Sequence, residues 1–109
     1  MTLPAFVGFT SVEDVLSTFK EKDLGNKEII VAALAGDGGF EENAYVLLKD
    51  AEGNLFEVEA GHCSCFGFEG LFQPAPITRE YLQQLTDSGA MRYGCKADAK
   101  PFIIEFLSK

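Results

Sequence analysis

The feature that most constrains this chain is a β-hairpin signal in its middle. Residues 55–60 (LFEVEA) alternate apolar and polar side chains, so one face of an extended strand is apolar and the other carries two glutamates. The preceding residues 50–54 (DAEGN) are typical of a hairpin turn, with Gly53 suited to a left-handed bulge position. The sequence therefore predicts a hairpin of strands 44–49 and 55–60, with its glutamate face at least partly in contact with solvent.

A third strand is predicted from an apolar run. Residues 28–35 (EIIVAALA) form a continuous apolar stretch of strand length, which is typical of a central strand covered on both faces. A short buried helix is the alternative, because alanine-rich runs also suit helices. The flanking glycines favour the strand, and the three strands together predict an antiparallel meander.

The first helix is expected at residues 11–22. Its apolar side chains recur at helical spacing and form one stripe. Thr10 and Glu13 fit a capping box, in which the hydroxyl and the carboxylate accept hydrogen bonds from free backbone N–H groups. This helix precedes all three predicted strands.

Two further helices are expected after the strands, at residues 78–88 and 98–108. Thr78 is the predicted N-cap of the first. Asp98 is the predicted cap of the second, with Pro101 in its first turn. The order α-β-β-β-α-α predicts an α+β fold, with the helices packed on one face of the meander.

Length and charge restrict the classes of function. Residues 1–109 are expected to form a single domain of ordinary globular composition, 47% apolar and 24% charged. The net charge of −8 opposes binding to nucleic acids and to anionic membranes. No apolar run approaches the about 20 residues that span a bilayer, and a basic signal region is lacking at the start, so we expect a cytoplasmic protein. An acidic protein suits basic partners, although solubility alone also explains the charge.

The stretch 60–70 (AGHCSCFGFEG) concentrates the side chains that carry chemistry. It holds the only histidine and two of the three cysteines. His62, Cys63 and Cys65, joined by Cys95 from the C-terminal part, are candidate zinc ligands, with Glu69 as a further oxygen ligand. The spacing opposes this interpretation, because His62 and Cys63 are adjacent and adjacent side chains diverge in extended backbone.

A nucleophilic thiol is the second interpretation of the same stretch. His62 beside Cys63 or Cys65 could lower the pKa of the thiol and act as a base. Cysteine hydrolases usually take their histidine from a distant segment, whereas the histidine here is next to the cysteines. The sequence therefore favours a cysteine-dependent enzyme least.

Two interpretations without catalysis remain. In the first, the cysteines are small buried hydrophobes, and the aromatic rings fill the core beneath a tight turn. In the second, the turn is a surface that binds a protein, because aromatic side chains concentrate binding energy. The sequence does not separate a core position from a surface position for Phe66 and Phe68. The candidate binding surface consists of His62, Cys63, Cys65, Phe66, Phe68 and Glu69.

Residues 56–70 also carry a resemblance. The run His-Cys-Ser-Cys-Phe-Gly-Phe-Glu-Gly at 62–70 resembles a motif, His-Cys-Ser-Cys-aromatic-Gly-x-Glu-Gly, in a family of small uncharacterised proteins of bacteriophages and prophages. The likeness extends over residues 44–86, and it weakens after Gly70, where Leu-Phe stands in place of a polar residue and a tryptophan. The resemblance implies a phage or mobile-element origin, an intracellular setting, and a role as a modulator of a host protein.

The sequence thus predicts a protein without a cofactor that binds a macromolecular partner, with a host protein as the candidate, through the turn after the third strand. A zinc-binding domain that uses His62, Cys63, Cys65 and Cys95 is the first alternative. A cysteine-dependent enzyme is the second alternative.

Overall fold

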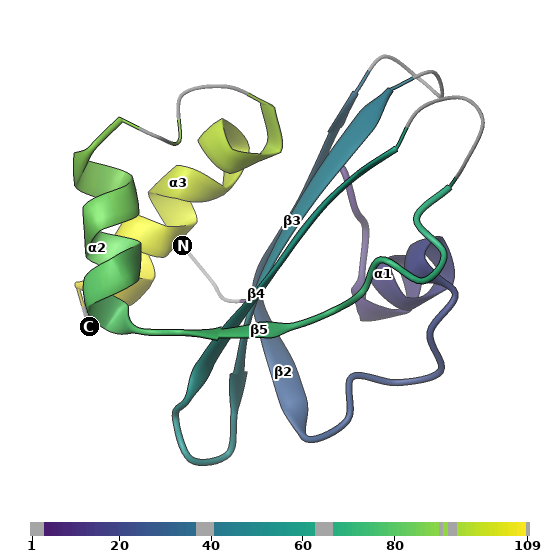
Figure 1. The fold of residues 1–109 in the computed structure, drawn as a ribbon, viewed down its shortest axis with the longest axis horizontal. Helices are drawn as coiled ribbons and strands as arrows, with labels where there is room; N and C mark the ends of the chain where they lie inside the picture. Colours follow the sequence, from purple (N-terminus) through teal and green to yellow (C-terminus); the bar gives the residue numbers. More distant parts are fainter. Residues whose placement is uncertain (1–3, 37–40, 63–66, 90, 92–93, 109) are drawn as a thin grey trace.

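A mixed β-sheet with helices on both sides forms the fold (Figure 1). The structure is a computed structural model, and it describes residues 4–36, 41–62, 67–89, 91 and 94–108. Within these residues the sheet has five strands in the order β1-β2-β3-β4-β5. The elements in chain order are β1 (Ala5–Val7), α1 (Val12–Phe19), β2 (Lys27–Gly36), β3 (Glu42–Asp50), β4 (Leu55–His62), β5 (Ala75–Ile77), α2 (Arg79–Asp87) and α3 (Gly94–Leu107). The predicted α+β class is confirmed.

The predicted hairpin and meander form the centre of this sheet. β2, β3 and β4 pair in antiparallel fashion, and all three extend beyond the predicted ranges. The turn between β3 and β4 is stabilised by Asp50, whose carboxylate accepts hydrogen bonds from the backbone N–H groups of Glu52 and Asn54. Gly53 has φ of 87° and occupies the left-handed position that the sequence assigns to it.

The prediction of a sheet with three antiparallel strands is wrong at both edges. β1 pairs in parallel with β2, and β5 pairs in antiparallel fashion with β4. Each added strand has only three residues. So short a segment carries no periodic signal, and it becomes a strand only because folding brings it beside a longer one. Pro76 in β5 fits this position, since proline in sheets is restricted to edges.

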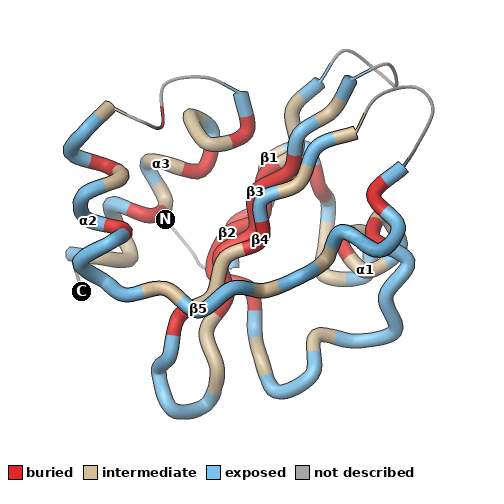
Figure 2. Tube along the Cα trace, in the orientation of Figure 1, coloured by how far each residue is buried: buried red, intermediate tan, exposed pale blue. Residues whose placement is uncertain are grey.

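The prediction that the helices pack on one face is also wrong. α1 covers one face of the sheet, whereas α2 and α3 cover the other (Figure 1). The middle residues of β2 and β3 are buried (Figure 2). Alternate side chains of β2 and β3 point to opposite faces, and both sets are apolar, so each face needs its own helical layer.

The two apolar cores differ in composition. On the α1 side, Phe9, Val15 and Phe19 pack on Val46 and Val58. The other core lies beneath α2 and α3 and contains, among other buried residues, Tyr45, Leu47, Leu82, Met91, Cys95, Ala99 and Ile103. The sheet therefore separates the molecule into two layers, and a side chain on one face does not reach the other.

Helix starts agree only in part with the sequence prediction. The N-cap of α1 is Ser11, whose Oγ accepts from the N–H of Asp14 at 3.1 Å. Asp14 in turn accepts from the N–H of Thr10 at 2.9 Å, so the predicted pair of Thr10 and Glu13 is displaced by one residue. Thr78 is confirmed as the cap of α2, because its Oγ1 accepts from the N–H of Tyr81 at 3.0 Å.

α3 begins four residues before its predicted cap. The helix includes Gly94, so Asp98 and Pro101 lie inside it rather than at its start. Three residues of α3 are buried at a spacing of four: Cys95, Ala99 and Ile103. Because this apolar stripe packs on the sheet on both sides of Pro101, the helix continues past the proline. None of the helices in the described part of the chain has the length and apolar character that crossing a membrane would need.

Candidate functional site

The stretch that the sequence singles out, residues 60–70, begins within the end of β4, which His62 closes. His62 pairs in register with Glu42, the first residue of β3. The Nε2 atom of His62 lies 2.9 Å from Oε1 of Glu42, and the two side chains are 9% and 26% exposed. A largely buried imidazole next to a carboxylate joins the ends of two neighbouring strands. His62 therefore anchors the chain where it leaves the sheet.

Phe68 is the second anchor. Its side chain is 3% exposed and belongs to the core on the α1 side. The rings of Phe68 and His62 meet edge to face, with centroids 4.4 Å apart and planes at 90°. Phe19 of α1 packs on Phe68 at 5.2 Å and on Phe72 at 5.2 Å. The structure thus resolves the alternative for Phe68 in favour of the core, whereas Phe66 lies outside the described residues.

An ordered β-turn follows this anchor. The N–H of Leu71 donates to the carbonyl of Phe68 at 3.0 Å, and Gly70 has φ of 80°, the left-handed geometry that suits glycine. The side-chain amide of Gln73 donates to the carbonyl of Gly70 at 3.2 Å. Glu69 is exposed, and Leu71 is 37% exposed. We call residues 68–71 the Phe68 turn.

The candidate binding surface is therefore divided between core and solvent. Of its described members, Glu69 is exposed, whereas His62 and Phe68 pack inward. Cys63 and Cys65 lie outside the described residues. Leu71, which the sequence prediction did not include, joins Glu69 on the surface. No periodic pattern marks Leu71, because its exposure follows from the turn alone.

The four candidate zinc ligands are not all brought together. His62 packs with Phe68 on the α1 side of the sheet, whereas Cys95 is buried beneath α3 on the other side. The two described members of the set are thus separated by the sheet. Among the described residues, no group of three His, Cys, Asp or Glu side chains is placed to hold a metal ion.

Cys95 is a buried free thiol in the first turn of α3. Burial raises the pKa of the Cys95 thiol, and this effect outweighs the neighbouring Lys96. A thiol held in its protonated form is a poor nucleophile near neutral pH. Cys95 therefore acts as a small apolar core residue, and it does not support a cysteine-dependent reaction.

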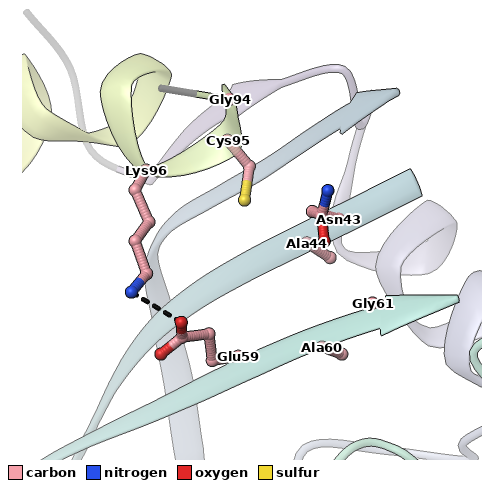
Figure 3. Close-up of a pocket in the computed structure, with 8 residues that line it drawn as sticks. All are labelled: Asn43, Ala44, Glu59, Ala60, Gly61, Gly94, Cys95 and Lys96. Carbon is pink, nitrogen blue, oxygen red and sulfur yellow. Dashed lines mark ion pairs between the residues drawn. The ribbon is translucent and has the colours of Figure 1, made fainter. Parts of the chain in front are cut away.

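A pocket of about 610 Å³ lies between the start of α3 and the ends of β3 and β4 (Figure 3). It is lined by Asn43, Ala44, Glu59, Ala60, Gly61, Gly94, Cys95 and Lys96. Lys96 forms an ion pair with Glu59 across it. This pocket could not be predicted from the sequence, because nothing in the sequence indicates that residues 94–96 meet residues 59–61.

Glycine at position 61 makes room for the side chain of Asn43 at this pocket. Gly61 pairs with Asn43 of β3, and both residues face α3. A Cβ atom at position 61 would lie 2.7 Å from Oδ1 of Asn43. Because Gly61 has no side chain, the Asn43 amide can lie directly against its backbone.

A cluster of two tyrosines and a glutamate ties the sheet to α2. The hydroxyls of Tyr45 and Tyr81 each donate to the carboxylate of Glu57 at 2.8 Å. Burial, reinforced by Glu57, raises the pKa of Tyr81 to about 12 and raises the pKa of Tyr45 further still. Both phenols stay protonated at neutral pH, so this cluster links β3, β4 and α2 rather than supplying a base.

Comparisons with protein-family models, with curated proteins and with solved structures find no match to this chain.

Proposed function

We propose that this chain is a protein-binding domain that docks on a basic surface of its partner through the Phe68 turn. One observation carries the proposal: a buried aromatic ring lies directly beneath an exposed, hydrogen-bonded turn. The anchor fixes the backbone, and the turn presents Glu69 and Leu71 outward.

A fixed turn favours association for an entropic reason. Binding through a mobile segment requires that segment to become ordered, which reduces the affinity. Here the hydrogen bond from Leu71 to Phe68 and the bond from Gln73 to Gly70 already define the turn. The backbone can thus meet a partner with little further ordering.

The chemistry of the partner follows from charge. The chain carries a net charge of −8, and Glu69 is exposed at the turn. A basic protein surface is attracted by this field, whereas the phosphates of nucleic acids are repelled. If the chain has the phage-type origin that the motif implies, the partner would be a basic host protein in the cytoplasm.

The proposal is tested by affinity capture from a bacterial lysate with quantitative mass spectrometry. The wild type is compared with Glu69→Lys and with Leu71→Ala, which change exposed side chains of the turn. Glu52→Lys is the matched control, because it makes the same charge change at an exposed residue of the β3–β4 turn, at the opposite end of β4.

We expect Glu69→Lys and Leu71→Ala to reduce capture of the partner by about tenfold, equivalent to about 1.4 kcal/mol. Glu52→Lys should retain capture. Equal losses for both charge reversals would show that overall charge, rather than the turn, determines binding. Full capture by both turn variants would refute the proposal.

A further inference from the structure

The outer edge of β4 is only partly paired. β5 meets β4 at three positions, Leu55 with Ile77, Phe56 with Pro76 and Glu57 with Ala75. β4 itself continues to residue 62. Among the described residues, no strand pairs with this edge beyond Glu57. The last part of β4 thus has one side paired with β3, and its other side has no strand from the ranges that the structure describes.

The register identifies the backbone groups on this open side. In an antiparallel pair, successive residues direct their N–H and C=O groups to opposite sides of the strand. Pro76 has no N–H and lies opposite Phe56, so the residues of β4 that bond to β5 are Leu55 and Glu57. By the same alternation, Glu59 and Gly61 direct their backbone groups outward.

The described residues directly before β5 do not extend its pairing to these groups. Continuing the register would place Gln73 opposite Glu59. The N–H of Gln73 donates instead to the carbonyl of Leu71 at 3.0 Å, and this segment runs toward α1 (Figure 1). Glu59 and Gly61 are both exposed. Within the described part of the chain, the two outward positions Glu59 and Gly61 thus offer two donors and two acceptors to an added strand.

The pocket adjoins the same edge. Glu59 and Gly61 line it, on the α3 face of the sheet (Figure 3). An added strand would point every second side chain to this face. The side chain opposite Gly61 would lie on this face, where Gly61 itself projects no side chain. The side chain opposite Glu59 would meet a carboxylate that is 52% exposed despite its ion pair with Lys96.

We propose that the β4 edge at Glu59 and Gly61 binds an extended, basic peptide segment of the partner, which adds to the sheet as a further strand. This inference rests on the proposed protein-binding function and specifies its binding mode. A second copy of the chain fits less well, because it would oppose two net charges of −8. A lysine or arginine opposite Glu59 would form a favourable cross-strand pair.

The first test measures amide hydrogen exchange by NMR on the wild-type protein. In the free protein, Glu59 and Gly61 should exchange at least tenfold faster than Val58 and Ala60, whose N–H groups face β3. Protection of Glu59 and Gly61 in the free protein would overturn the proposal, because their donors would already be occupied.

The second test selects binders from a randomised octapeptide library against the wild-type protein. Selected peptides should be basic, and adding one should slow exchange at Glu59 and Gly61 by at least tenfold. Gly61→Pro removes an outward donor but leaves the β3–β4 hydrogen bonds in place, whereas Gly61→Ala adds a methyl group and keeps the donor. Affinity should fall at least tenfold in Gly61→Pro and less than about threefold in Gly61→Ala.

The outcomes separate this inference from the proposed function. A library that yields no binder, or peptides whose affinity is unchanged in Gly61→Pro, would overturn strand addition. If Glu69→Lys abolishes capture of the lysate partner while Gly61→Pro does not, the turn alone binds and the inference fails. If Gly61→Pro abolishes capture while Glu69→Lys does not, the edge is the site and the turn is not.

Discussion

Replacement of Phe68 by alanine distinguishes a core side chain from an interface side chain. The ring is 3% exposed and packs on Phe19 and on His62. Truncating a buried phenylalanine removes its apolar contacts and leaves a cavity, which destabilises a protein by about 3–5 kcal/mol. We expect Phe68→Ala to reduce the free energy of unfolding by this amount, a large fraction of the about 5–15 kcal/mol typical of a domain.

Urea denaturation followed by circular dichroism measures this change. For a chain of this size the m-value is about 1.5 kcal/mol/M, so the unfolding midpoint should fall by about 2–3 M. Glu69→Ala is the matched control, because it truncates the exposed neighbouring side chain. Its effect should lie within about 0.5 kcal/mol.

A loss below about 1 kcal/mol in Phe68→Ala would refute the assignment of Phe68 to the core. The expected result also affects the binding experiments. A variant that is destabilised this strongly loses partners because it unfolds, so Phe68 is a poor choice for mapping an interface. Glu69 and Leu71 are the informative positions.

Two further predictions concern titratable groups. The pKa of Tyr81 is raised from 10.0 to about 12 in the folded state, chiefly by burial, so folding favours the protonated phenol. This contribution is complete below pH 10 and is lost as the pH rises toward 12, so the urea midpoint should fall in this interval, and by less in Tyr81→Phe. An equal fall in both proteins would contradict the assignment. The raised pKa of the Cys95 thiol predicts that iodoacetamide alkylates Cys95 more slowly than free cysteine at neutral pH. Mass spectrometry of the Cys95 peptide measures this rate, and a rate above that of free cysteine would show an activated thiol.

The two anchors of the Phe68 turn show why its position could be predicted but its role could not. The residues around position 62 mark the end of a strand, because glycines and small side chains follow an alternating run. Whether Phe68 points inward depends on Phe19, which lies 49 positions earlier and reaches the ring only after α1 has packed on the sheet. No local pattern in the sequence records that contact.

The candidate zinc ligands also show that the sequence does not determine which residues meet in the fold. His62 and Cys95 carry suitable ligand atoms, and the sequence does not show on which side of the sheet each one lies. In the fold, His62 faces α1 and Cys95 faces the strands from α3, so the sheet separates them. The ligand atoms are a property of the residue types, whereas their placement depends on which face each helix covers.

The sequence alone predicts those elements whose stabilising hydrogen bonds join residues close together in the chain. The hairpin at residues 50–54 and the cap at Thr78 depend on hydrogen bonds within four positions, so the sequence alone determined them. The edge strands β1 and β5, the division of the helices between two faces, and the pocket beside Glu59 and Gly61 depend on long-range pairing. Only the tertiary structure decides these features, because their stabilising contacts do not exist until distant segments meet.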